Sequence, residues 1–257
     1  MKKSIFIIGF IIILALGSCS EKNSDSSFSA INSNDGSITG KGGSLARFCI
    51  AENYLYVVDE SNLYTYTLAN PAKPVKTSET KMGFGIETIF YYQGHLYIGS
   101  NNGMIICTIA NPANPTVLST YSHITSCDPV VVQGNYAYVT LRTGTTCNRG
   151  LNQLEVINIS DKNNPTLVKI IQMTNPWGLG IDGKHLFVCE NAEDISYYDI
   201  TVEANPVFKK KFEDIFAFDI IPENNLLITT GKEGIKQYDY SKLPNSLDLL
   251  SKIEIGK

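Results

Sequence analysis

The sequence predicts an all-β fold, a five-bladed β-propeller of four-stranded antiparallel blades. The first observation is a repeat. Five short apolar segments start 41, 41, 49 and 40 residues apart, at Leu55, Leu96, Ala137, Leu186 and Leu226. The second is a later apolar position in each copy, which in four copies is followed six residues on by proline. Repeats of about 40 to 45 residues with four strands each are typical of propeller blades.

The second repeat is the clearest example of a blade. Residues 85–92 form an apolar run that predicts an inner strand, and residues 95–100 predict the next strand. Asn102-Gly103 is a strong hairpin signal before a third strand, and a loop with two prolines leads to an outer strand. Because the ring begins on an inner strand and ends on an outer one, no strand is left to close it by exchange unless Ser37-Ile38-Thr39 pairs beside the last blade. We therefore expect closure mainly through packing between the first and fifth blades. The pattern places the blades of the 44–257 propeller at 44–83, 84–124, 125–174, 175–214 and 215–257.

The residues before the propeller predict export. A positive start at Met1-Lys2-Lys3, an apolar stretch from Ile5 to Leu16 and small residues up to Cys19 follow the plan of a signal peptide over residues 1–18. The apolar stretch is shorter than the roughly 20 residues that a transmembrane helix needs. Residues 19–43 are mostly small and polar, which predicts a flexible linker.

Leu16-Gly17-Ser18-Cys19 resembles the lipobox of bacterial lipoproteins. The resemblance implies cleavage before Cys19 and acylation of this residue. Several acyl chains anchor a protein stably, because each buried methylene contributes roughly 0.8 kcal/mol. We therefore expect an exported protein, lipid-anchored in the bacterial cell envelope at the outer membrane, on its periplasmic or its surface side.

Two strand motifs and the recurring Asn-Pro turns resemble a known family. Leu55-Tyr56-Val57-Val58-Asp59 and Leu154-Glu155-Val156-Ile157-Asn158 are similar to the repeat of LVIVD-repeat proteins, which are bacterial propeller-like lipoproteins. The resemblance covers roughly residues 42 to 255. It implies the propeller fold and assigns no activity.

The charge of the chain argues against a nucleic-acid partner. The formal net charge is -4 and the pI is about 5.4, whereas proteins that bind the phosphate backbone usually have a concentrated basic face. Lys209-Lys210-Lys211 is the only basic run, and it falls where a lysine-protected outer strand is predicted.

Unusual residues concentrate in two kinds of loop that lie on the same face of a propeller: the segment before each inner strand and the loop joining the second and third strands. Glu87, Asp128 and Trp177 each stand nine residues before the first residue of the apolar segment in their own repeat. This shared spacing predicts that the three side chains form one tier around the channel mouth. The third blade adds nine residues on this face, either as a ligand wall or as a harmless insertion. The candidate ligand-binding face comprises Arg47, Glu87, Asp128, Arg142, Arg149 and Trp177.

The cysteines divide into two groups. Cys127 and Cys147 fall in the two kinds of loop, and an exported chain permits a disulfide between them, worth roughly 3 kcal/mol in the chain-entropy model. Cys49, Cys107 and Cys189 fall within strands and are predicted to be buried as small hydrophobic residues. A metal site at Cys127, Cys147 and His123 is the alternative to the disulfide, but their spacing matches no closed zinc pattern. We expect no metal and no cofactor.

The sequence leaves three functions open. The first is a non-catalytic binding module, which presents the candidate face to an envelope protein or glycan. The second is an envelope carbohydrate-active enzyme, a glycosidase or lyase, with Glu87 and Asp128 as weak candidates for paired catalytic carboxylates. The third is a purely structural role in an envelope complex.

Overall fold

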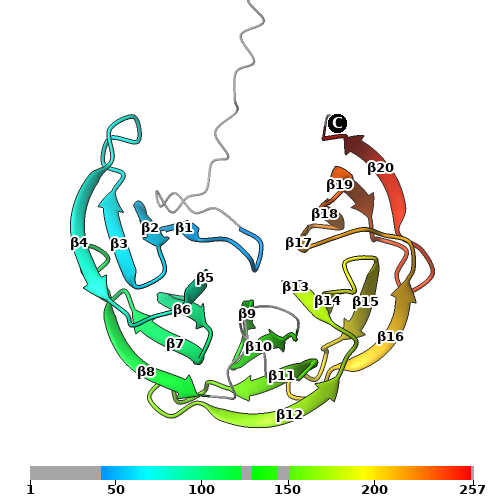
Figure 1. The fold of residues 1–257 in the computed structure, drawn as a ribbon, viewed down its shortest axis with the longest axis horizontal. Helices are drawn as coiled ribbons and strands as arrows, with labels where there is room; N and C mark the ends of the chain where they lie inside the picture. The colour runs from blue at the N-terminus through cyan, green and yellow to red at the C-terminus, as the bar shows by residue number, and fades with distance from the viewer. Residues whose placement is uncertain (1–41, 123–128, 144–150, 256–257) are drawn as a thin grey trace, which may run out of the picture. The chain divides into compact units, whose positions relative to one another are not determined.

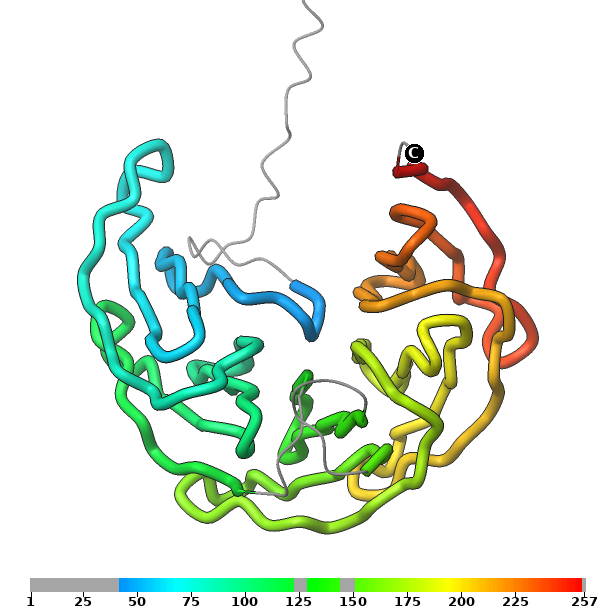
Figure 2. The backbone as a smooth tube through the Cα atoms, viewed as in Figure 1, coloured from blue at the N-terminus to red at the C-terminus, as the bar shows by residue number. Residues whose placement is uncertain are grey.

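The computed structural model describes residues 42–122, 129–143 and 151–255, which all belong to the compact unit Gly36–Lys257. They form five four-stranded antiparallel sheets that follow one another along the chain, which confirms the predicted propeller (Figure 1). The inner strands β1, β5, β9, β13 and β17 contact one another in sequence order, and each sheet runs from its inner to its outer strand without crossing (Figure 2).

The strands of each blade lie within the residue spans expected from the repeat. The first three blades are β1 (Phe48–Ala51), β2 (Tyr54–Val58), β3 (Asn62–Thr67), β4 (Val75–Lys81); β5 (Ile86–Tyr92), β6 (His95–Ser100), β7 (Gly103–Thr108), β8 (Thr116–Ser122); β9 (Val130–Gln133), β10 (Tyr136–Leu141), β11 (Gln153–Asn158), β12 (Thr166–Gln172). The last two blades are β13 (Pro176–Asp182), β14 (His185–Glu190), β15 (Asp194–Asp199), β16 (Val207–Phe212); β17 (Asp219–Glu223), β18 (Leu226–Gly231), β19 (Gly234–Asp239), β20 (Asp248–Ile253).

Each blade has two apolar faces, because successive side chains of a strand point to opposite sides of the sheet. In β6, Leu96 and Ile98 pack toward the first blade, while Tyr97 packs toward the third. We call these the backward face and the forward face. Four core clusters join the forward face of one blade to the backward face of the next, between blades 1 and 2, 2 and 3, 3 and 4, and 4 and 5.

The strand register corrects the repeat alignment in the fifth blade. Leu227 pairs with Tyr238 as Leu96 pairs with Cys107, so Leu227, and not Leu226, is the counterpart of Leu96. Both residues are leucines, and sequence spacing alone did not separate them. The corrected position makes Phe218 the residue nine positions earlier, in the same tier as Trp177.

The blades are stabilised by a hydrogen bond that recurs five times. The last residue of each third strand accepts the backbone N–H two residues later, with donor–acceptor distances from 2.7 to 3.2 Å. The acceptors are Thr67, Thr108, Asn158, Asp199 and Asp239. This turn restrains the loop that leads to the outer strand.

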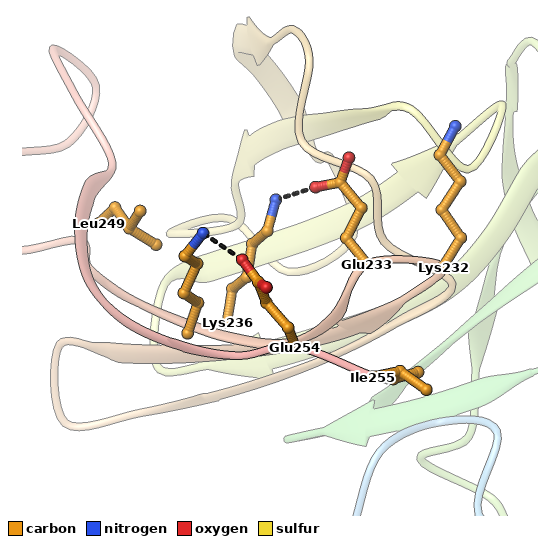
Figure 3. A pocket seen from close by; sticks show the side chains of 7 residues that line it. Lys232, Glu233, Lys236, Leu249, Glu254 and Ile255 are labelled. Atoms are coloured by element: carbon orange, nitrogen blue, oxygen red, sulfur yellow. Dashed lines mark hydrogen bonds and ion pairs between the residues drawn. The ribbon is translucent and has the colours of Figure 1, made fainter. Parts of the chain in front are cut away.

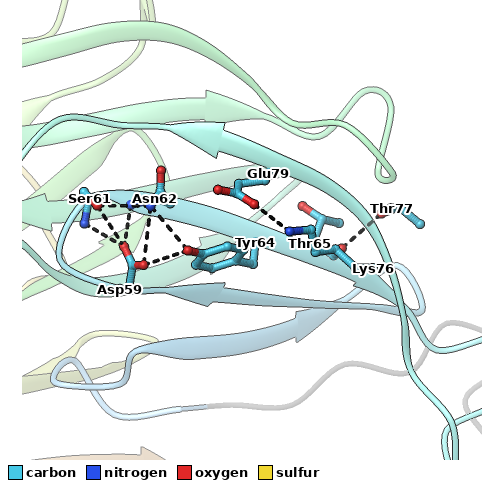
Figure 4. Close-up of polar contacts among 8 residues, drawn as sticks. All are labelled: Asp59, Ser61, Asn62, Tyr64, Thr65, Lys76, Thr77 and Glu79. Carbon is cyan, nitrogen blue, oxygen red and sulfur yellow. Dashed lines mark hydrogen bonds and ion pairs between the residues drawn. The ribbon is translucent and has the colours of Figure 1, made fainter.

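The acidic residue at the end of β2 has a similar local role. Asp59 accepts hydrogen bonds from the backbone N–H groups of Ser61 and Asn62 and from the hydroxyl of Tyr64, at 2.6 to 2.8 Å (Figure 4). These donors hold the pKa of its carboxyl well below the usual range. Asp59 therefore shapes the hairpin between β2 and β3.

The first and fifth blades are joined near the axis by hydrogen bonds. The Asp219 carboxylate accepts the backbone N–H groups of Ser44 and Leu45 at 3.2 and 3.0 Å and the Ser44 hydroxyl at 2.9 Å. No core cluster of the described residues spans these two blades, so the expectation that packed faces close the ring is wrong for this part of the chain. Ser37-Ile38-Thr39, the alternative closing strand, lies outside the described residues.

Candidate functional site

Two kinds of loop meet on one face of the propeller, here called the loop face: the segments before the inner strands and the hairpin loops between second and third strands. The backbone N–H of Ile86, where β5 begins, donates to the carbonyl of Glu60 in the β2–β3 hairpin at 3.1 Å. The hydroxyl of Thr140 donates to the carbonyl of Trp177 in the next blade at 2.7 Å. Neighbouring blades are thus linked directly beside the candidate residues.

Arg142 and Trp177 form the centre of the candidate site. The guanidinium carbon of Arg142, which follows β10, lies 3.6 Å from the centroid of the Trp177 ring in β13. Phe218 also packs against the indole, with ring centroids 5.1 Å apart and the rings tilted by 35°. A guanidinium at this distance gains a cation–π interaction, so the side chain of Arg142 is held in place.

Glu87 joins this pair from the second blade. It is the second residue of β5 and is half-buried. Burial raises the pKa of its carboxyl, and the positive charges of Arg47 and Arg142 oppose that rise. Burial lowers the pKa of Arg142, and Glu87 opposes that change in turn. Among the described residues, two guanidinium groups therefore act on one carboxylate.

The structure brings four of the predicted residues together from four successive blades: Arg47, Glu87, Arg142 and Trp177. Three of them are half-buried, and Arg47 is exposed. The other two residues of the predicted face, Asp128 and Arg149, lie outside the described residues, as do Cys127 and Cys147 of the predicted disulfide, His123 and the predicted lipidation site Cys19. These predictions remain as made.

The indole nitrogen of Trp177 adds a polar feature to the site. Its Nε1 is buried and has no hydrogen-bond partner within the described ranges. Buried donors are nearly always paired, and a lone one calls for an explanation. A ligand with an acceptor atom would supply the missing partner.

Sequence reasoning missed a second cation–aromatic pair on the loop face. The ammonium of Lys232, in the β18–β19 hairpin, lies 3.5 Å from the ring centroid of Phe216, in the segment before β17. The corrected register would have revealed Phe218 by its spacing. Phe216 and Lys232 carry no repeat signal, so their contact was visible only in three dimensions.

Asp219 occupies the axis side of the same region. Burial raises the pKa of its carboxyl despite four hydrogen-bond donors, which include the N–H of Ile220. Gly43 and Gly178 leave room for it, because a Cβ on either residue would lie 2.0 or 2.4 Å from a carboxylate oxygen. Asp219 is a structural connection between blades.

The family comparison agrees with the strand pattern. The LVIVD repeat matches residues 42–75, 88–123 and 126–172, which fall on the first three blades. The chain is a β-propeller with LVIVD repeats. The repeat covers strands and turns. Asp59, which follows the second strand β2, and Asn158, which ends the third strand β11, occupy different positions in their blades, and both make the local hydrogen bonds described above.

Solved structures resemble this LVIVD-repeat propeller in fold. A functionally unknown protein from Desulfotomaculum acetoxidans has 13% identity and a TM-score of 0.61, over 79% of this chain and 68% of that chain. A protein from Lactobacillus plantarum has 12% identity and a TM-score of 0.61, over 79% and 69%. The periplasmic gluconolactonase of Pseudomonas aeruginosa has 10% identity and a TM-score of 0.61, over 80% and 68%. At these identities the likeness shows the fold alone. A search of the curated proteins gave no match.

The described cysteines and histidines of the LVIVD-repeat propeller have structural roles. Cys49, Cys107 and Cys189 are free and buried, as predicted, and burial raises the pKa of Cys49 and Cys107 to about 12, which keeps both as thiols. His95 bonds the carbonyl of Gln93, and His185 bonds the Tyr197 hydroxyl. The described residues contain no group of three side chains suited to a metal ion.

A hollow of about 680 Å³ lies against the fifth blade (Figure 3). It is lined by Lys232, Glu233, Lys236, Leu249, Lys252, Glu254 and Ile255. Lys236 pairs with Glu233 at 2.6 Å, and Lys252 pairs with Glu254. These pairs cancel most of the local charge, so the hollow has no strong electrostatic preference.

The basic run lies on the outer strand β16, where it was predicted. Lys209 pairs with Asp199 at 3.5 Å, and Lys211 pairs with the buried Glu190 at 2.9 Å. Lys210 donates to the carbonyl of Asn245 at 2.6 Å.

In the described part of the chain, no helix is long and apolar enough to cross a membrane.

The electrostatics of Glu87 predict a pH effect on stability. Because its folded-state pKa is raised above 4.5, the neutral form is favoured by folding, and the stability that this gives is lost as pH rises through the folded pKa. Glu87→Gln removes this dependence. The stability of Glu87→Gln relative to the native protein should therefore increase between pH 4 and pH 7, measured by urea denaturation. A difference that stays constant with pH would contradict the environment assigned to Glu87.

Proposed function

We propose that the protein is a lipid-anchored, non-catalytic binding module of the cell envelope, which holds an acidic group of a protein or glycan partner on its loop face. The observation that carries the proposal is the meeting of Arg47, Glu87, Arg142 and Trp177 from four blades. Residues that pack a blade recur in every repeat, whereas these four do not. A site assembled across blades fits binding on a rigid scaffold.

The charges favour an acidic ligand. Arg47 and Arg142 outnumber Glu87 among the described residues, and a guanidinium binds a carboxylate in a planar, two-point geometry. Arg142 is already ordered on the Trp177 ring, so less conformational entropy is lost on binding. Because Arg142 covers one face of the indole, Trp177 is better suited to positioning Arg142 and to donating its Nε1 hydrogen than to stacking on a sugar.

The envelope location rests on the amino-terminal pattern. The signal peptide expected at residues 1–18 and the lipobox-like Leu16-Gly17-Ser18-Cys19 support export and a lipid anchor at Cys19. The partner would then be another component of the envelope. No nucleic acid and no cofactor is part of the proposal.

The binding proposal is tested with the full-length protein immobilised from detergent and exposed to solubilised envelope. Native protein should retain a protein or acidic glycan that is released by salt, and Arg142→Ala with Trp177→Ala should retain roughly tenfold less. Lys210→Ala on the outer strand is the matched control. Equal retention by the native protein and the double variant would show that the loop face is not the binding surface.

A second candidate function is hydrolysis or lyase chemistry with Glu87 as the acid. The raised pKa of this half-buried carboxyl favours it, since a general acid must stay protonated near its working pH. Asp128, its predicted partner, lies outside the described residues. A panel of envelope polysaccharides would reveal turnover by the native protein and its loss in Glu87→Gln. Turnover unchanged in Glu87→Gln would remove this function.

A further inference from the structure

The fifth blade presents an uncovered forward face. Ile235 in β19 occupies the position that Leu63, Met104, Leu154 and Ile195 occupy in the other blades. Those four side chains are fully buried, at 0% exposure, whereas Ile235 is 42% exposed. Ile253, its partner in β20, is 68% exposed, while the counterpart Phe212 of the fourth blade is 8% exposed.

The first blade presents an uncovered backward face. Phe48 in β1 pairs with Val57 as Ile89 pairs with Ile98 in the second blade. Phe48 is 57% exposed, and its counterparts in the other four blades are between 0% and 2% exposed. These counterparts are Ile89, Val130, Leu179 and Ile220. We call the two uncovered faces together the seam.

The seam combines two surfaces that are built to be covered. Everywhere else in the described chain a forward face packs on a backward face, through apolar side chains in the same register. Near the axis, Asp219 and Ser44 hold the two blades together. Apolar sheet faces left exposed at matching positions mark an interaction site.

We propose that the seam binds a β-hairpin or larger β-sheet segment of a partner protein, with apolar side chains on both of its faces. An occupant must meet the forward face of blade 5 on one side and the backward face of blade 1 on the other, as blades 2, 3 and 4 do within the chain. In a second copy of this chain, none of the five blades, as far as their described residues show, has both faces free. The proposal is independent of the loop-face function, because none of the seam residues belongs to that site.

The solved propellers that resemble this chain are longer than the part that it matches. The first three aligned structures match 79 to 80% of this chain but only 68 to 69% of their own. Each of these solved chains is therefore longer than the part that matches the five blades. The chemistry of the occupant follows from the two uncovered walls: Ile235 and Ile253 on one side and Phe48 on the other require a β-sheet segment with apolar side chains on both faces.

The test uses a synthetic probe whose two faces match the walls. The peptide 185–199 of this chain carries Leu186 and Val188 on its backward face and Phe187 and Ile195 on its forward face. Isolated hairpins are marginal in water, so the peptide is cyclised through its ends. Its binding to the full-length protein in detergent is followed by fluorescence anisotropy.

Saturable binding to the native protein is expected, and Ile235→Asp and Phe48→Asp should each weaken it by roughly tenfold or more. Leu167→Asp is the matched control, because Leu167 is 43% exposed on the outer strand β12, away from the seam. All three substitutions are at exposed positions, so melting temperatures should stay within about 2 °C of the native value.

Four results would overturn the proposal. Absence of saturable binding to the native protein, or equal binding by all four proteins, would show that the seam does not bind a hairpin. A native dimer that Ile235→Asp converts to a monomer would assign the seam to a second copy. A fall in melting temperature in Ile235→Asp as large as in Leu63→Asp would show that blades 1 and 5 pack on each other in solution.

Discussion

Asp219→Ala should lower the free energy of unfolding by about 3 kcal/mol, because it leaves four donors without their acceptor, three of them in part-buried contacts. The carboxylate accepts four hydrogen bonds: from the backbone N–H groups of Ser44, Leu45 and Ile220 and from the Ser44 hydroxyl. The same Ser44 hydroxyl accepts the N–H of Leu179 at 2.8 Å, so the loss extends into the fourth blade. Urea denaturation of native and variant protein measures the effect.

Asp219→Asn is the control for this prediction. The amide keeps one acceptor oxygen in nearly the same volume, so the loss should be smaller than in Asp219→Ala. Ser44→Ala, which removes one hydroxyl, should also cost less. A stability of Asp219→Ala within about 0.5 kcal/mol of the native value would show that the first and fifth blades are held together by other contacts.

Leu63→Ala and Ile235→Ala should have very different effects although both residues occupy the same repeat position. Leu63 is fully buried between the first and second blades, so the truncation should cost about 3 kcal/mol through lost burial and a residual cavity. Ile235 is 42% exposed, and its truncation should cost less than about 1 kcal/mol. Thermal and urea denaturation of both variants provide the comparison.

Ile195→Ala serves as a second buried reference, in the fourth blade, and should resemble Leu63→Ala. Equal costs for Ile235→Ala and these two variants would mean that the forward face of the fifth blade is covered in solution. The comparison thus measures the seam directly, without any ligand.

Much of the fold could be predicted because it repeats. The period, the Asn102-Gly103 hairpin signal and the proline-containing loops indicate five blades of four strands, which the structure has. The fifth blade was misaligned by one residue, because Leu226 and Leu227 satisfy the same apolar pattern. Closure was not predictable, since the Ser44–Asp219 contact spans 175 residues and neither residue recurs in the repeat.

The candidate site was partly predictable for the same reason. Counting nine residues back from the start of each apolar segment places Glu87 and Trp177 in one tier. The structure adds the contact between Arg142 and the Trp177 ring. The raised pKa of Glu87 depends on burial and on two arginines from other blades, which spacing does not reveal. Phe216 with Lys232 was missed because a cation–aromatic contact has no period.

The turn at the end of each third strand bears on how such sequences should be compared. Two threonines, an asparagine and two aspartates make the same hydrogen bond, so the position requires an acceptor atom and tolerates loss of the negative charge. An acidic residue there thus indicates the geometry of the turn and not a chemical role. Differences in ligand between propellers of this kind should be sought where copies within one chain disagree, such as the tier that holds Glu87, Trp177 and Phe218.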